Sequence, residues 1–344
     1  MRSEDIARLA GVSRSTVSRV INNYSDIPQK TRDKVLKIIE QYHYEPNTSA
    51  RVLAGKSTST IGLFVVSLSE QPGVNRIYQN NYFAPFVDAV IDTANAAGYY
   101  VLVHTIYAEE DFAKVKQAFL QKRIDGGIIV GTQKNAELIG GIARIGLPFV
   151  LIDYDVADIL EHRLSDSPIT VVNSDDYEGA MAAMNHLISA GHKEIGFISG
   201  HMNTYSGKQR FRAYEAALRT HKLPVRPEYV LNGRFLKQAA YEETKRLLKL
   251  DRLPTAIFSA NDDMAIAAMN ALREHGLRIP DDMALIGFDD VPVAAQLIPS
   301  LSTVRLPIYD MSKEAVSRLV GMFENGAGTL SSVSFPTSLI IRDS

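Results

Sequence analysis

The sequence predicts an α/β protein in which a small all-α head precedes a body of two doubly wound, parallel-sheet subdomains. Two observations carry this prediction. The first 46 residues contain three short amphipathic helix patterns. From residue 59 onward, short β-rich apolar runs alternate with longer helical patterns, which is typical of parallel sheets covered by helices on both faces. The length of 344 residues fits about two domains with a sizeable core.

The composition is that of a soluble globular protein, and it excludes several classes of site. The chain has no cysteine, which excludes disulfides, thiolate catalysis and cysteine metal sites. It has no apolar run of about 18 residues or more, and its N-terminus lacks the apolar core of a signal peptide, so a cytoplasmic location without a membrane span is expected. Residues 1–60 hold ten Lys and Arg against six Asp and Glu, whereas the other 284 residues hold 27 against 33. This asymmetry suggests that only the head meets a polyanion.

The head has the pattern of a helix-turn-helix. Residues 4–10 and 14–22 are amphipathic, with Ser3 and Ser13 as expected caps and Gly11 permitting the sharp turn between them. A third pattern, residues 29–43, completes a three-helix core. The side chains expected in that core are Ile6, Leu9, Ala10, Val17, Val20, Ile21, Val35, Ile38, Ile39 and Tyr42. The outward face of the second helix carries groups that can bond base edges and phosphates in a major groove, namely Arg14, Ser15, Ser18, Arg19 and Asn22.

A segment that follows the head, residues 47–55, is marked as a helix at both ends but spans only about two turns. Asn47 can cap its N-terminus and Gly55 can take the left-handed conformation that closes it. Isolated helices shorter than roughly 12–15 residues are marginal in water. The segment therefore needs a partner surface, which we expect to be DNA, the body or both.

Polar residues follow several predicted strands of the body, where ligands of parallel α/β sheets bind. These polar residues follow the strands expected at residues 149–152, 195–199, 256–259 and 285–288. Ligand contact is predicted for four of them, Asp153, Arg210, Asn261 and Asp289, because carboxylates accept from hydroxyl groups and arginine donates a fixed fork. Asp262 and Asp290 are predicted instead to cap the helices that follow.

Signatures of enzymes are missing from the sequence. It contains no Gly-x-Gly-x-x-Gly, no phosphate loop, no Gly-x-Ser-x-Gly and no His-Glu-x-x-His. We therefore predict no catalytic residue, no metal site and no cofactor.

Four motifs run through the head and the segment after it: residues 5–13 (DIARLAGVS), 16–22 (TVSRVIN), 44–47 (YEPN) and 50–53 (ARVL). They resemble bacterial repressors of the lactose/galactose (LacI/GalR) family, and the resemblance continues through the whole chain. It implies that residues 47–55 form a hinge helix that orders on the operator and wedges Leu53 into the minor groove, where an apolar side chain can kink DNA. The residues implied to contact DNA are Arg14, Ser15, Thr16, Ser18, Arg19, Asn22, Ala50 and Leu53.

The resemblance also implies a body that folds like a periplasmic sugar-binding protein, crossed by the chain near residues 155, 303 and 327. The implied domains are 1–46 for DNA binding, 47–58 for the hinge helix and linker, and 59–344 for effector binding and dimerisation, divided into subdomains of about 59–155 with 304–326 and about 156–303 with 327–344. The implied effector contacts are Tyr82, Phe83, Asp153, Arg210, Phe235, Asn261 and Asp289. Segment 69–83 is longer than the family's usual turn, and Gly207 and Ala213 depart from the family's usual residues, so the resemblance does not carry over the effector's identity.

The expected function is that of a homodimeric, sequence-specific transcriptional regulator, a repressor, on a pseudo-palindromic double-stranded DNA operator. A small sugar-like effector bound between the subdomains would control its DNA affinity allosterically. Two alternatives stay open from the sequence. One keeps the DNA-binding head but replaces the sugar with a nucleobase or a phosphoprotein co-regulator. The other is a solute-binding protein without operator function.

Overall fold

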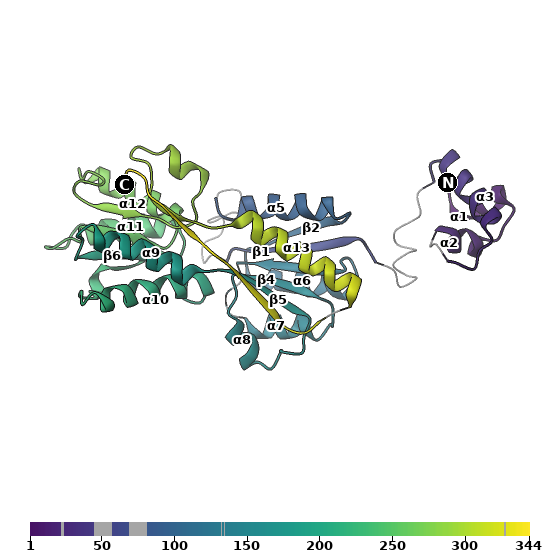
Figure 1. Cartoon of the computed structure of the whole chain (residues 1–344), viewed down its shortest axis with the longest axis horizontal. Coiled ribbons are helices and arrows are strands. Elements are labelled where there is room, and N and C mark those ends of the chain that lie inside the picture. The colour runs from purple at the N-terminus through teal and green to yellow at the C-terminus, as the bar shows by residue number, and fades with distance from the viewer. Residues whose placement is uncertain (22–23, 45–56, 69–80, 132, 134, 327) are drawn as a thin grey trace. The chain divides into compact units, whose positions relative to one another are not determined.

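The computed structural model describes residues 1–21, 24–44, 57–68, 81–131, 133, 135–326 and 328–344 (Figure 1). The chain forms two compact units, Met1–Thr58 and Ser59–Ser344, which are considered in turn. The predicted hinge helix at residues 47–55 lies outside the described residues, as do Asn22, Ala50 and Leu53.

Among its described residues, the first unit holds three helices around a small apolar core. They are α1 (Ser3–Ala10), α2 (Arg14–Ile21) and α3 (Gln29–Gln41). The core consists of Ile6, Ala7, Ala10, Val17, Val20 and Val35. Gly11 ends α1 with φ of 64°, the left-handed conformation that the sharp turn requires. Ser13 caps α2 as predicted, because its Oγ accepts the Thr16 N–H at 3.1 Å.

Three details of the head differ from the prediction. Leu9 and Tyr42 are 44% and 42% exposed. Leu9 lies outside the buried stripe of α1, and Tyr42 lies just after the last residue of α3. Ser3 lies inside α1 and does not cap it. Arg2 occupies the cap position, and its backbone N–H donates to the Asp5 carboxylate at 3.0 Å.

The second unit begins with a six-stranded parallel sheet in the order β11-β5-β4-β3-β1-β2. Its strands are β1 (Thr60–Val66), β2 (Tyr100–Ile106), β3 (Gly126–Val130), β4 (Phe149–Ile152), β5 (Ile169–Ser174) and β11 (Ser331–Phe335). The helices around it are α5 (Phe83–Ala96), η2 (Glu109–Asp111), α6 (Phe112–Leu120), α7 (Ala136–Ala143), α8 (Val156–Glu161) and α13 (Ile308–Asn325). Successive residues of β1 face opposite sides: Ile61 and Leu63 join a core with α5 and α13, whereas Phe64 joins a core with α6 and α7 (Figure 1). The sheet is therefore doubly wound, as predicted.

A second parallel sheet, in the order β7-β6-β8-β9, forms the other half of this unit. Its strands are β6 (Ile195–Ser199), β7 (Val230–Asn232), β8 (Ala256–Ser259) and β9 (Ala284–Ile286). Its helices are α9 (Asp176–Ser189), α10 (Tyr205–Thr220), η3 (Pro227–Tyr229), α11 (Lys237–Leu247), α12 (Asp262–Glu274) and η4 (Pro292–Gln296). One apolar core runs through this half, and its largest group of aromatic rings surrounds Phe197.

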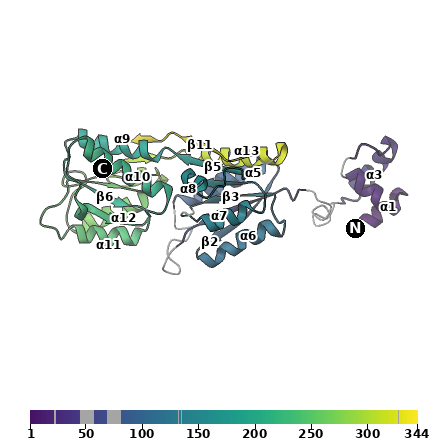
Figure 2. The same ribbon diagram turned by 90° about the horizontal axis from the view of Figure 1, so that it is seen from below.

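Three chain segments connect the two halves, and two of them lie elsewhere than predicted. The first crossing follows Ser174, not residue 155, because β5 pairs in register with β4 and so belongs to the first sheet. The third follows Phe335, not residue 327, because β11 pairs with β5 (Figure 2). The second crossing lies close to its predicted place, between the antiparallel pair of β10 (Thr303–Arg305) with β12 (Ser338–Ile340) and the start of α13.

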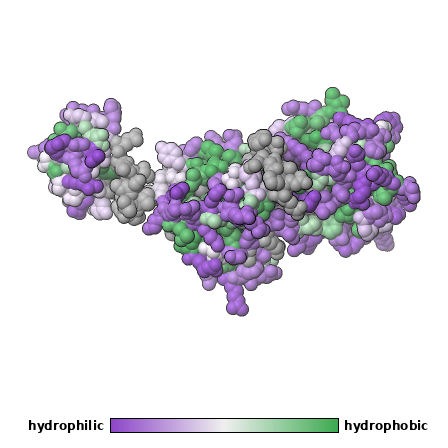
Figure 3. Space-filling model, turned by 180° about the vertical axis from the view of Figure 1, so that it is seen from behind, coloured by the Kyte–Doolittle hydropathy of each residue, from purple (hydrophilic) through white to green (hydrophobic). Residues whose placement is uncertain are grey.

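Hydrophobic residues occur in small groups among hydrophilic ones on the face shown in Figure 3. Among the described residues, no helix combines the length and the apolar character needed to cross a bilayer.

The aromatic core of the second half provides a test of the fold. Phe197 is fully buried, and its ring lies 5.0 Å from that of Tyr214 and 5.4 Å from that of Phe258, measured between centroids. We expect Phe197→Ala to lower the free energy of unfolding by about 3–5 kcal/mol, because it removes apolar contacts and leaves a cavity. Urea denaturation of the full chain measures this loss. The control is Leu160→Ala at a 54% exposed position of α8, and equal losses in the two variants would contradict the assigned core.

Candidate functional site

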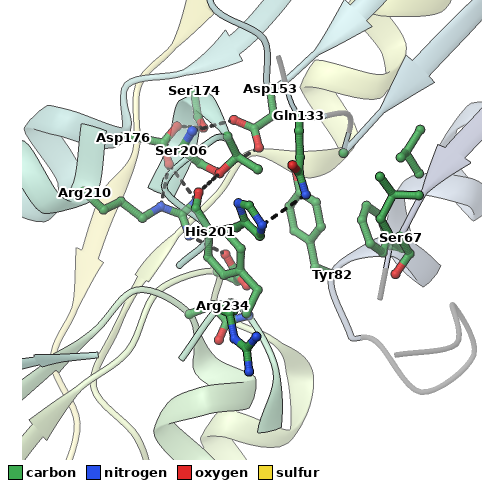
Figure 4. A pocket seen from close by; sticks show the side chains of 18 of the residues that line it. Ser67, Tyr82, Gln133, Asp153, Ser174, Asp176, His201, Ser206, Arg210 and Arg234 are labelled. Carbon is green, nitrogen blue, oxygen red and sulfur yellow. Dashed lines mark hydrogen bonds and ion pairs between the residues drawn. The ribbon is translucent and has the colours of Figure 1, made fainter. Parts of the chain in front are cut away.

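A cavity lies between the two halves of the second unit, at the carboxyl ends of their strands (Figure 4). The space not filled by protein atoms, including the open space at the cavity mouth, is about 830 Å³. The structure brings all seven residues predicted to contact an effector to its lining: Tyr82, Phe83, Asp153, Arg210, Phe235, Asn261 and Asp289. Tyr82 and Phe83 come from the start of α5 in the first half, whereas Arg210 lies on α10 in the second. Parallel α/β sheets present ligand sites at this edge.

Arg210 is the centre of the polar part of the cavity. Its Nε donates to Asp176 Oδ1 at 2.7 Å, and its Nη2 lies 2.6 Å from the same oxygen. Its Nη1 donates to the Ala260 carbonyl at 2.5 Å and, more weakly, to Asp289 Oδ1 at 3.4 Å. The guanidinium also stacks 3.7 Å above the Phe288 ring centroid. Most of its N–H groups are therefore already used by the protein itself.

Burial of this arginine is compensated by the carboxylates around it. Burial alone would lower the pKa of the Arg210 guanidinium, but the charges of Asp176 and Asp289 outweigh burial and raise that pKa. Burial also raises the pKa of Asp289 well above its usual value, against the opposing effect of Arg210. The result is a guanidinium that stays charged within an acidic surrounding.

Asp153 faces Arg210 from the end of β4. Its carboxylate accepts the Ser206 N–H at 2.8 Å and the Ser206 hydroxyl at 2.7 Å. Burial and the charge of Asp176 raise the pKa of Asp153 to about 7, although the Ser206 hydrogen bonds act in the opposite direction. Figure 4 shows Asp153, Asp176, Ser206 and Arg210 grouped together, with Tyr82 across the cavity.

Aromatic side chains form the apolar part of the lining. The Tyr82 and Phe83 rings meet edge to face with centroids 5.3 Å apart. The Phe235 ring lies against Gly200 so closely that a Cβ on that glycine would come within 2.1 Å of the ring. Phe235 itself has φ of 59°, which is an unfavourable conformation for a bulky side chain.

Four non-glycine residues of this cavity have a positive φ. Asp153, Arg234, Phe235 and Asp289 all line it, and their φ angles are 61°, 52°, 59° and 120°. Residues in such conformations persist only where the surrounding structure holds them, and they cluster at functional sites.

Asp176 is the main polar residue that the sequence analysis did not single out. It begins α9 directly after β5, and its Oδ2 accepts from the Ser174 hydroxyl at 2.8 Å. The sequence 173–176 (NSDD) is itself a polar strand end, so the rule that selected Asp153 and Asp289 also applies to it. The strand predicted at residues 169–172 ends two residues before β5 does, so this polar end lies beyond it. Other lining residues outside the prediction are Gln133, His201, Thr204 and Ser206.

Two capping predictions were wrong. Asn261, and not Asp262, caps α12, because its Oδ1 accepts the Met264 N–H at 2.9 Å. Asp262 is buried one position later and accepts from the Thr303 hydroxyl at 2.6 Å and the Val291 N–H at 2.9 Å. Asp290 caps no helix and pairs with Arg305 and Arg342, each at 2.6 Å.

A second candidate site is the exposed face of α2 in the head. Arg14, Ser15, Ser18 and Arg19 are exposed there, whereas Thr16 is half-buried and its hydroxyl lies 2.9 Å from Ser13 Oγ. Arg14 pairs with Glu4 at 3.3 Å, and Arg19 pairs with Asp26. Hydroxyl and guanidinium groups on one open helix face can reach base edges in a major groove.

Two family models match parts of the chain. Residues 4–47 match the family model for "Bacterial regulatory proteins, lacI family", and residues 184–344 match that for "Periplasmic binding protein-like domain". The chain is 34% identical over 343 residues to the "Probable HTH-type transcriptional repressor ExuR" of Bacillus subtilis (strain 168), covering 99% of this chain and 97% of that protein. It is 33% identical over 350 residues to the "HTH-type transcriptional repressor PurR" of Haemophilus influenzae (strain PittEE), with the same coverage.

Two solved structures are similar over nearly the full length. One is a lac repressor dimer bound to operator and an anti-inducer, with a TM-score of 0.78 and 26% identity, covering 98% of this chain and 97% of that one. The other is a complex of the transcriptional regulator CelR with cellobiose, with a TM-score of 0.76 and 26% identity, covering 100% and 99%.

The raised pKa of Asp153 predicts a pH dependence of stability. The folded protein holds a proton on Asp153 up to about pH 7, whereas the group's ordinary pKa is 3.8. This contribution to stability is fully present below about pH 4 and is lost as the pH rises through 7. Asp153→Asn removes the titration, keeps acceptor and donor atoms for Ser206, and tolerates the positive φ.

We therefore expect the unfolding free energy of the wild type to fall, relative to Asp153→Asn, between about pH 4 and pH 7. Urea denaturation at several pH values measures the difference. Asp166→Asn, at an exposed position, serves as the matched control. Parallel pH profiles for wild type and Asp153→Asn would show that Asp153 is ionised like an ordinary surface carboxylate.

Proposed function

The chain belongs to the LacI family of bacterial regulatory proteins, and from this premise we propose a repressor whose DNA affinity is set by a neutral, polyhydroxylated effector bound between the two halves of its body. The relatives are transcriptional repressors and not enzymes. The observation that carries the effector proposal is a group of carboxyl side chains beyond the strand ends. Asp176 and Asp289 are buried against Arg210, and the half-buried Asp153 accepts two hydrogen bonds from Ser206.

The head supports a role in sequence-specific binding to double-stranded DNA. The exposed face of α2 carries two arginines and two serines, which suit base edges and phosphates. In this proposal a homodimer reads a pseudo-palindromic operator, since two heads related by a two-fold axis match two half-sites. Residues 47–55, which lie outside the described part of the chain, would form the hinge helix and place Leu53 in the minor groove.

The charge of the cavity favours a neutral effector over an anionic one. Asp153, Asp176 and Asp289 can each accept hydrogen bonds from hydroxyl groups of a ligand. Arg210 has little left to offer an anion, because Asp176, the Ala260 carbonyl and Asp289 already occupy most of its donors. A phosphate or carboxylate at Arg210 would therefore meet the buried Asp176 carboxylate, while few N–H groups of the arginine remain to bind it.

The apolar lining favours a ligand with hydrophobic faces as well as hydroxyl groups. The rings of Tyr82, Phe83 and Phe235 line the same cavity as the carboxylates. Sugars combine C–H faces, which pack on aromatic rings, with hydroxyl edges. One solved relative is a complex with cellobiose, and a neutral mono- or disaccharide is the effector class that we propose for this chain.

The mechanism that we propose is a coupling between the cavity and the DNA-binding end of the body. A ligand that touches Tyr82 in one half and Phe235 in the other has different contacts in open and closed forms of the cavity, and so shifts the equilibrium between them. Closure would change the separation of the two hinge segments in a dimer.

A thermal-shift panel tests the effector class. It compares neutral mono- and disaccharides with the matching uronic acids and sugar phosphates, and with nucleobases. We expect at least one neutral sugar to raise the melting temperature and to change operator retention, while its phosphate and its uronic acid bind more weakly. A sugar phosphate or uronic acid that binds more tightly than its neutral parent would contradict the proposal, as would a nucleobase as the best ligand.

The variant Phe235→Leu refines this test. It should weaken the responding sugar by about 2- to 10-fold, because an aromatic face is lost. Phe211→Leu is the matched control, since Phe211 is an aromatic residue of the same half that packs on Phe197 and does not line the cavity. If the two variants bind the sugar with equal affinity, Phe235 does not contact it.

A further inference from the structure

Asp26 occupies an unusual place for a carboxylate in a DNA-reading head. It lies in the loop between α2 and α3, and it accepts a hydrogen bond from Nη2 of Arg19, which stands on the exposed face of α2. The side chains of Arg19 and Asp26 are 47% and 51% exposed. Exposed ion pairs contribute little to folding stability, and a carboxylate near the phosphate backbone weakens DNA affinity. Stability and general DNA affinity therefore do not explain this pair.

The loop that carries Asp26 is anchored on both sides. The Tyr24 N–H donates to the Arg19 carbonyl at 3.0 Å, and a guanidinium N–H of Arg32 on α3 donates to the Tyr24 carbonyl. Ile27, next to Asp26, packs against the apolar core of the head. These contacts hold the Asp26 carboxylate at a fixed place relative to α2.

The Arg19 guanidinium is held in two ways. Asp26 binds one of its terminal nitrogens, and the Tyr24 ring lies beneath it, with 5.5 Å between Arg19 Cζ and the ring centroid. One hydrogen bond to Asp26 leaves further N–H groups of the fork available, and two parallel donors are what the O6 and N7 atoms of guanine accept in the major groove. A fork that is oriented before DNA arrives loses less conformational freedom on binding.

We propose that Asp26 is a positioning residue that orients Arg19 to read a guanine in each half-site of the operator. This inference rests on the proposed function and names a base that the head reads. In physical terms, the Asp26 carboxylate lowers the affinity for DNA of any sequence and raises the preference for guanine at one base pair. Arg14, the other arginine on this face of α2, differs from Arg19. Its Nη1 lies 3.3 Å from Oε1 of Glu4 on α1, and the side chains of Arg14 and Glu4 are more exposed, at 66% and 57%.

The experiment is selection of the full-length protein on a pool of randomised DNA duplexes, followed by sequencing of the bound fraction. Wild type, Arg19→Lys, Asp26→Asn, Asp26→Glu and Glu4→Gln are compared at one salt concentration. Arg19→Lys identifies the base position that Arg19 reads, because lysine cannot form the two parallel hydrogen bonds of a guanidinium and the preference at that position is lost. Thermal unfolding of each variant checks that the head is folded.

We expect wild type to prefer guanine at the position that Arg19→Lys loses. Asp26→Asn should lower that preference by about 10-fold or more, within the range that a bidentate contact supplies, and bind random duplex at least as tightly as wild type. Asp26→Glu should restore part of the preference, because the carboxylate returns. Glu4→Gln removes the same charge from the other ion pair and should leave that preference unchanged.

Two results would overturn the inference while the proposed function stands. One is an Asp26→Asn variant that keeps the full guanine preference and binds all duplexes more tightly, since Asp26 would then only restrain Arg19. The other is a loss of preference equal in Asp26→Asn and Glu4→Gln, since charge alone would then account for it. A wild-type protein that enriches no sequence would instead contradict sequence-specific binding itself.

Discussion

A buried guanidinium surrounded by carboxylates is the constraint on which the sensor body depends. Arg210 is 4% exposed and contacts Asp176 and Asp289, which are also buried. These groups come from α10, the first residue of α9 and the segment after β9, so the ion pairs join chain segments that are far apart in sequence. Removing one partner from such a network leaves an uncompensated buried charge, which is far more costly than the net worth of the pair. The network therefore fixes the strand ends relative to one another.

The same network shapes the cavity in which we propose that an effector binds. Positive φ angles at Asp153, Phe235 and Asp289 hold polar and aromatic side chains toward the space between the halves. That space is lined from both halves, which are connected by the three crossings that follow β5, β10 and β11. A ligand that exchanges its own hydroxyl groups for water at these carboxylates changes the balance between open and closed arrangements.

Much of this arrangement could be predicted from the sequence, because parallel strands place their carboxyl ends together. Strand-end polarity alone selected Asp153, Asn261 and Asp289. It did not identify Asp176, because the end of β5 was expected two residues earlier, and the first crossing was expected near residue 155. Periodicity cannot distinguish a strand that adds to the first sheet from one that begins the second, since pairing partners are set by tertiary contacts. Capping roles at Asn261 and Asp262 depend on one residue of register, which sequence patterns do not resolve.

A double-mutant cycle between Arg210 and Asp176 tests the central claim most directly. Arg210→Met keeps the length and apolar stem of the side chain and removes its charge. We expect it to lower the free energy of unfolding by about 3–5 kcal/mol in the wild-type background, and by at least about 1 kcal/mol less when Asp176→Asn is already present. Urea denaturation of the four proteins at neutral pH gives the coupling energy. Equal losses in both backgrounds, or a loss below about 1 kcal/mol in wild type, would contradict a network centred on Arg210.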